Sequence, residues 1–307
     1  MHPAPSIILF TTASGLGYGL AAMLGLGLVD PASVSAKVAH VLALALIGGG
    51  LLSSTLHLGN PQRAWRAFSQ WRSSWLSREG VMALVTFVPL VLSAWFVVVE
   101  GRYAPVAGLV GAALCAVTVY CTAMIYASLK AVDAWHTPLT PACYLLFALA
   151  GGLVASVFFA TTAGGAGRWL IAAAMCAVAV AWGVKLVWRG RLASAASTST
   201  PESATGLGHI GRVRLLERPH MTENYLTREM GFRVARKHAR KLFVIALVAG
   251  AALPFVLLGG SLAAGPGGAA SLLMAGMALL SFGFGTLVER WLFFAEARHA
   301  VMNYYGG

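Results

Sequence analysis

The stretch VMALVTFVPLVLSAWFVVV, residues 81–99, contains nineteen consecutive residues without a charged side chain. A helix of about 20 apolar residues is long enough to cross the roughly 30 Å hydrocarbon core of a bilayer. Comparable runs recur along the chain, and the predicted spans cover residues 6–28, 38–58, 78–99, 105–128, 139–162, 168–188, 242–262 and 269–294. The sequence therefore predicts an all-α, polytopic membrane protein, an eight-transmembrane-helix bundle in which residues 1–307 form a single integral membrane domain.

The composition supports this class of protein. Hydrophobic residues make up 58% of the 307 residues and charged residues only 10%, whereas about 25% of the residues of a soluble domain are charged. The first apolar run begins after Pro5 without a preceding Lys or Arg or a convincing cleavage site, so we expect it to remain as a span. The net charge of +12 comes from cations that bracket the spans, so we expect contact with membrane lipid and no binding of nucleic acid.

Basic residues are distributed unequally between the two ends of the predicted bundle. With eight spans both termini lie on the same side, and 19 of the 22 Lys and Arg residues fall on that side. The opposite side holds only Lys37, Arg102 and Arg168. Because basic residues accumulate in cytoplasmic connections, this asymmetry predicts that both termini lie in the cytoplasm.

The longest connection, residues 189–241, also lies on the predicted cytoplasmic side. Its first part, Ala193–Gly206, is rich in Ser, Thr and Ala and is typical of a flexible linker. Its second part, Thr222–Lys241, has apolar residues at every fourth position among basic ones, which predicts an amphipathic helix on the membrane surface. Two interpretations remain open: an anchor on anionic lipid, or a docking surface for a soluble partner.

A polar stretch follows the second predicted span. Gly59 and Pro61 form a helix stop, because glycine can take the left-handed position after the last turn and proline cannot continue the helix. His57 is therefore expected in the final turn of that span, at the cytoplasmic edge of the hydrocarbon. An imidazole there can donate or accept a hydrogen bond and titrates near neutral pH.

Further polar residues are expected at the same depth. Ser77 is a candidate N-cap of the third span, which would place Glu79 in its first turn, where the helix dipole favours an anion. His57, Arg63 and Glu79 would then lie together between the ends of consecutive helices, next to the interfacial Trp65. A headgroup that carries carbonyl oxygens and exchanges protons could use these groups, although a helix-end histidine and cap residues are more often structural.

The eighth predicted span ends with ionisable residues. Glu289, Phe293 and Glu296 share one helical face, and Arg290 can pair with a neighbour. Ionisable groups at this depth usually face a bundle interior or a wet cavity. Intramolecular pairing that fixes helix packing is the favoured interpretation, and a proton route is the alternative.

Metal and haem sites are not expected in this chain. The cysteines lie singly in apolar segments, without a C-x-x-C or Cys/His cluster, and they are Cys115, Cys121, Cys143 and Cys176. His40 and His57 are 17 residues apart, about 25 Å along one helix. These two histidines are therefore expected near opposite faces of the membrane and cannot ligate one haem.

The residues His57–Ala64, with the pattern His-Leu-Gly-x-Pro-x-Arg-Ala, are followed by the Ser-x-Glu of Ser77–Glu79. This combination resembles the anchor-subunit family of dimethyl sulfoxide reductase, which is related to the polysulfide-reductase-type membrane subunits. Two more stretches, Glu217–Lys241 and Glu289–Tyr305, are similar to the membrane subunit of cytoplasmic sulfite-oxidising (sulfite dehydrogenase) molybdoenzyme complexes.

The resemblance implies a three-part complex in a bacterial inner membrane. A molybdenum catalytic subunit and an iron–sulfur subunit would dock on the cytoplasmic face, and this chain would be the anchor and the quinone site. The residues carried over from the family are His57, Arg63 and Glu79, and Gly59, Trp65 and Arg66 are expected beside them in the binding site. The cofactor would be ubiquinone or menaquinone, with no haem or iron–sulfur cluster in this chain.

Several functional interpretations follow from these observations. In the sulfite interpretation the quinone is reduced, and in the sulfoxide interpretation the quinol is oxidised. A secondary transporter that uses Glu289 and Glu296 as coupling residues is an alternative from another class, although the sequence has no convincing internal repeat. A passive anchor, in which His57 only packs, is the third possibility.

Overall fold

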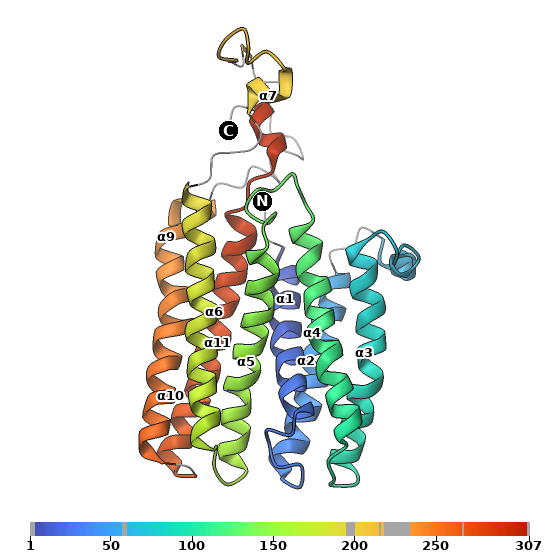
Figure 1. Cartoon of the computed structure of the whole chain (residues 1–307), viewed down its shortest axis with the longest axis vertical. Coiled ribbons are helices and arrows are strands. Elements are labelled where there is room, and N and C mark those ends of the chain that lie inside the picture. Colours follow the sequence, from blue (N-terminus) through green and yellow to red (C-terminus); the bar gives the residue numbers. More distant parts are fainter. Residues whose placement is uncertain are drawn as a thin grey trace.

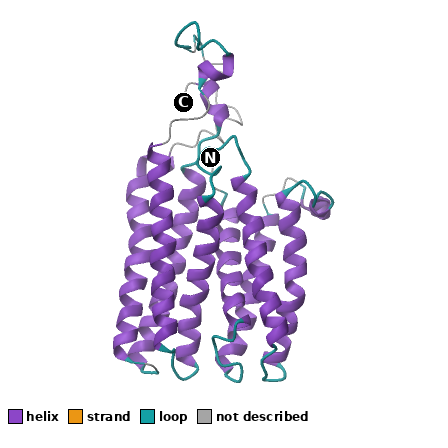
Figure 2. Cartoon of the chain, in the orientation of Figure 1, coloured by secondary structure: helices purple, strands orange, loops and turns teal. Residues whose placement is uncertain are grey.

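The computed structural model describes residues 4–56, 60–194, 200–214, 216–217, 234–265 and 267–305. Eight of its helical segments are long and apolar enough to cross a membrane. Within the described residues the chain is helical and has no strand, as Figure 2 shows. The prediction of an all-α polytopic membrane protein is therefore confirmed.

Seven of the spans are single helices. They are α1 (Pro5–Gly25), α2 (Val34–Thr55), α3 (Trp75–Val98), α4 (Pro105–Ala127), α5 (Leu139–Thr162), α6 (Arg168–Ser194) and α11 (Ala269–Ala295). The remaining span consists of α9 (Val234–Leu247), the π-helical segment η2 (Val248–Ala252) and α10 (Leu253–Ala264). Shorter elements are η1 (Pro61–Phe68), α7 (Pro201–Thr205) and η3 (Ala300–Tyr305).

The termini and α7, which lies in the connection between α6 and α9, are at the same end of the bundle, which we call the termini end (the top of Figure 1). The connections α1–α2, α3–α4, α5–α6 and α10–α11 lie at the opposite end. Arg102 is at that opposite end, where it pairs with Glu100 at 2.5 Å. The even number of spans thus gives the arrangement that the sequence predicted.

Helices α1 and α5 form the centre of the bundle. Within the most apolar 18-residue stretch of each helix, 67% of the residues are buried in α1 and 72% in α5, compared with 28% in the seventh span. The two helices approach closely at Gly19 and Gly152, where a Cβ on either residue would collide with the backbone of the other helix. Small residues allow such close backbone contact between membrane helices. The outward faces of the bundle are apolar, as at the exposed Val88 of α3.

The seventh span contains an irregular turn whose cause is Pro254. Proline has no N–H group, so the carbonyl of Gly250, four residues before it, loses its helical donor. The Leu253 N–H donates to the Val248 carbonyl, five residues back, and so leaves the Ala249 carbonyl without its usual helical donor. The Trp182 indole N–H donates to the Gly250 carbonyl at 2.8 Å. The Ser281 hydroxyl donates to the Ala249 carbonyl at 2.6 Å. Side chains of α6 and α11 thus replace the two missing backbone hydrogen bonds.

Candidate functional site

The described part of α2 ends at Thr55, with Leu56 at its C-cap. The hydroxyls of Ser54 and Thr55 donate to the carbonyls three residues before them, both at 2.7 Å, as is common in a final helical turn. His57 and Gly59 lie outside the described residues, so the expected position of His57 stays a prediction. The chain is described again from Asn60, and η1 follows from Pro61.

Helix α3 begins earlier than the sequence predicted. Its first residue is Trp75 and Ser74 occupies the N-cap position, so the expectation that Ser77 is the N-cap is wrong. The Ser77 hydroxyl instead donates to the Ala67 carbonyl and ties α3 to η1. Glu79 therefore lies in the second turn of α3, and the helix has no acidic residue in its first turn.

Tertiary contacts hold this additional turn of α3. The Arg78 guanidinium lies over the Trp75 ring at 4.3 Å from its centroid. It also donates to the carbonyls of Trp71 at 3.1 Å and Arg72 at 2.7 Å. On the other side, the Trp75 ring packs edge-on against Tyr120 of α4, with centroids 5.9 Å apart. These contacts fix the start of α3 without a side-chain cap.

The Glu79 carboxyl group is buried between α3 and α4. Its residue is only 5% exposed, and the Thr122 hydroxyl donates a hydrogen bond to Oε1 at 2.5 Å. A carboxyl group inside an apolar bundle is costly and is often retained for proton transfer or binding. Glu79 is therefore the strongest candidate for a functional group among the described residues of this region.

The other predicted site residues lie on the surface of η1. Arg63, Trp65 and Arg66 are exposed, and the Arg66 guanidinium lies 5.5 Å from the centroid of the Trp65 ring. Within the described ranges, no hydrogen bond or ion pair joins any of these three to Glu79. The structure thus places the carboxyl group inside the bundle and the η1 side chains outside it.

A second group of charged residues joins α6 to α11. Lys185 contacts Glu289 at 2.5 Å, and Arg290 lies 3.4 Å from the other oxygen of the same carboxylate. Nearer the termini end, Arg189 makes two hydrogen bonds to Glu296, at 2.7 and 3.0 Å. The structure thus shows the intramolecular pairing that the sequence favoured for Glu289 and Glu296, and it identifies the partners on α6 that sequence reasoning missed.

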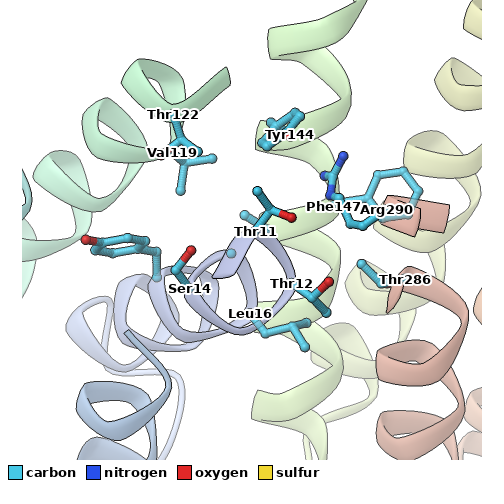
Figure 3. A pocket seen from close by; sticks show the side chains of 13 residues that line it. Thr11, Thr12, Ser14, Leu16, Val119, Thr122, Tyr144, Phe147, Thr286 and Arg290 are labelled. Carbon is cyan, nitrogen blue, oxygen red and sulfur yellow. The ribbon is translucent and has the colours of Figure 1, made fainter. Parts of the chain in front are cut away.

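A cavity of about 20 Å³ lies between these two charged regions. Its walls come from α1, α4, α5 and α11, and Figure 3 shows Thr122 on one side and Arg290 on another. Thr122, the hydrogen-bond partner of Glu79, therefore also faces the cavity. Sequence reasoning missed this feature because, apart from Arg290, its polar side chains are single hydroxyl residues scattered in apolar runs.

No group of three or more His, Cys, Asp or Glu residues that could hold a metal ion occurs in the part of the chain that the structure describes. Cys115, Cys121 and Cys143 are buried and Cys176 is exposed. The His40 ring is buried in α2, where Nδ1 lies 2.8 Å from the Ala36 carbonyl oxygen. Cys115, Cys121, Cys143 and His40 are therefore packed inside the bundle.

Eight spans define an integral membrane protein, and the carboxyl group buried near the start of α3 marks its candidate functional site at the termini end. Residues 1–294 match the family model described as DMSO reductase anchor subunit (DmsC). The chain belongs to this family, which confirms the resemblance seen in the sequence. Its role is that of a membrane anchor in a molybdoenzyme complex, and this role implies catalytic and iron–sulfur partner subunits.

The chain is also similar to a known protein along its whole length. It is 31% identical over 335 aligned positions to a sulfite dehydrogenase subunit from Allochromatium vinosum, with 99% of each chain covered. The similarity thus extends beyond the residues that match the family model.

Proposed function

We propose that the chain binds a quinone at the termini end of α2 and α3 and passes electrons between an iron–sulfur subunit and the quinone pool. The observation that carries this proposal is the burial of Glu79 beside Thr122 in a member of the anchor family. Exposed apolar side chains border the same region: Leu56 is 79% exposed and Phe68 is 39% exposed. These apolar side chains suit a quinone, because its ring carries a hydrocarbon tail.

The chemistry of a quinone sets requirements for the protein side chains. When bound, the quinone supplies a two-electron acceptor whose reduction also consumes two protons. Glu79 can hold and transfer a proton from its carboxyl group, and His57 would donate a hydrogen bond to a ring oxygen. Arg63, Trp65 and Arg66 would border the headgroup together with Gly59.

The proposal also covers the orientation of the chain in the membrane and the face of the membrane on which its partner subunits dock. The excess of basic residues at the termini end supports cytoplasmic termini in a bacterial inner membrane, with the iron–sulfur and molybdenum subunits docked on that face. The 189–241 connection, with its basic residues, would contribute to docking or to lipid binding. The similarity to a sulfite dehydrogenase subunit supports sulfite oxidation coupled to quinone reduction. The family description supports the second candidate, a quinol-oxidising anchor.

The test separates the quinone step from the chemistry of the catalytic subunit. The variants Glu79→Gln and His57→Ala are made in the whole complex, and sulfite-to-quinone turnover is measured in membranes beside sulfite-to-dye turnover. We expect each variant to lower the quinone-linked rate about 100-fold, the lower range for loss of an acid–base group, with an unchanged dye-linked rate. Glu100→Gln is the control, because Glu100 is an acidic residue at the opposite end of the bundle. Quinone-linked rates equal to that of the control would remove both residues from the mechanism.

A further inference from the structure

The charges buried between α6 and α11 do not balance. Lys185 is 2% exposed, Arg290 is 3% exposed and Glu289 is fully buried, so two cations share one carboxylate. Lys185 holds the nearer position, at 2.5 Å, and Arg290 lies at 3.4 Å. A buried charge without a full counterion is strongly unfavourable in a membrane interior. An additional negative charge near Arg290 would balance this cluster.

The guanidinium of Arg290 also has unused donors. Its Nε and Nη1 atoms are buried and make no hydrogen bond to any described residue, although Nη1 is the atom that lies 3.4 Å from Glu289. The guanidinium lies over the Tyr144 ring at 3.8 Å from the centroid. This cation–π contact gives the N–H groups of the guanidinium no acceptor atom for a hydrogen bond. Arg290 lines the cavity between α1, α4, α5 and α11, and Figure 3 shows it reaching toward Tyr144.

Hydroxyl groups on three helices line the same cavity. The hydroxyls of Thr12, Tyr144 and Thr286, like that of Tyr18, are buried and find no hydrogen-bond partner among the residues that the structure describes. Thr12, Tyr144 and Thr286 come from α1, α5 and α11, and each is labelled at the pocket in Figure 3. Buried hydroxyls in native proteins almost always have a partner. Together with Arg290, these side chains thus offer donors to one small space.

The size and chemistry of the cavity define what it binds. A volume of about 20 Å³ holds one particle of the size of a water molecule, and it is too small for a quinone ring or a sulfur oxyanion. A water molecule can exchange hydrogen bonds with these hydroxyls, which both donate and accept, but it neutralises no charge. Glu79 makes no ion pair with a cation of the cluster, and its carboxyl group accepts its hydrogen bond from Thr122.

We propose that this cavity binds a small monovalent anion of the chloride class. The anion accepts hydrogen bonds from Arg290 and from the hydroxyls of Thr12, Tyr144 and Thr286, and it balances the second cation of the Lys185–Glu289–Arg290 cluster. Because the donors belong to α1, α5 and α11, the ion also joins the central helices of the bundle to the eighth span.

Bromide is the probe for this site. The complex is purified without chloride and titrated with sodium bromide against sodium gluconate at constant ionic strength, while its thermal unfolding is followed. We expect a saturable rise in the unfolding temperature for the parent, and a bromide anomalous-scattering peak in the cavity of the crystallised complex. Thr286→Val keeps the shape of the side chain but removes one donor, so we expect the bromide affinity to fall about 10-fold.

Two more variants complete the test. Arg290→Gln should abolish the bromide response, whereas the control Arg189→Gln should keep it, because Arg189 pairs with Glu296 and does not line the cavity. If Arg290→Gln does not assemble, Thr286→Val still decides the question. The proposal is overturned if the parent shows no bromide-specific response, if the cavity holds only water, or if Thr286→Val and Arg189→Gln respond equally.

Discussion

Replacing Glu289 by Gln should be the most destabilising change of a single charge in the described bundle. Its carboxylate is fully buried and contacts Lys185 at 2.5 Å and Arg290 at 3.4 Å. At an effective dielectric constant of 20, these distances correspond to gross attractions of about 7 and 5 kcal/mol. Much of this is offset by the cost of desolvating the three groups, and removal of one partner from a buried pair typically costs about 3–5 kcal/mol. We therefore expect Glu289→Gln to lower the free energy of unfolding by about 4 kcal/mol.

The assay is unfolding of the purified complex by SDS titration in bicelles of fixed composition, with helicity followed by circular dichroism. Glu296→Gln is the matched control, because Glu296 also pairs across α6 and α11 but its side chain is 13% exposed and that of its partner Arg189 is 24% exposed. A pair near the surface contributes about 1 kcal/mol or less. If the two variants lose equal stability, the buried cluster is not a special contributor and the reasoning from burial is wrong.

Three further outcomes are expected. Thr122→Val removes the hydrogen bond to Glu79, and it should lower quinone-linked turnover about 10-fold while sulfite-to-dye turnover stays at the parent level. Gly152→Val places a side chain against the backbone of α1 and should abolish accumulation in membranes, measured by immunoblot, whereas Gly183→Val, which meets open space, should accumulate normally. Trp182→Phe removes the indole donor to the seventh span, and it should reduce the free energy of unfolding by about 1–3 kcal/mol, the cost of a buried acceptor left unpaired; an unchanged SDS midpoint would contradict that role.

The number of spans could be predicted from the sequence, because apolar length is a requirement of the bilayer itself and depends little on tertiary contacts. The start of α3 could not. Ser77 has the residue type and spacing of an N-cap, yet the contacts of Trp75 with Tyr120 and Arg78 hold an earlier turn. Packing across helices overrides a local capping signal in this case.

Only part of the candidate site could be predicted from the sequence, because its contacts join helices that are far apart in the chain. A carboxyl residue at the start of an apolar run is visible in the sequence, so Glu79 could be selected. Its partner Thr122 is 43 residues away, and a threonine in an apolar helix gives no signal of its own. The same holds for Lys185, whose pairing with Glu289 depends on how α6 and α11 face each other. Pairings between distant helices require the three-dimensional arrangement.

The turn before Pro254 has a consequence for biosynthesis. The carbonyl of Gly250 receives its donor from α6, which is made earlier, but that of Ala249 receives its donor from Ser281 of α11, which is made later. An unpaired carbonyl in hydrocarbon costs several kcal/mol. The seventh span therefore reaches its final pairing only after the ribosome has delivered the eighth, and the last two spans should leave the translocon as one hairpin.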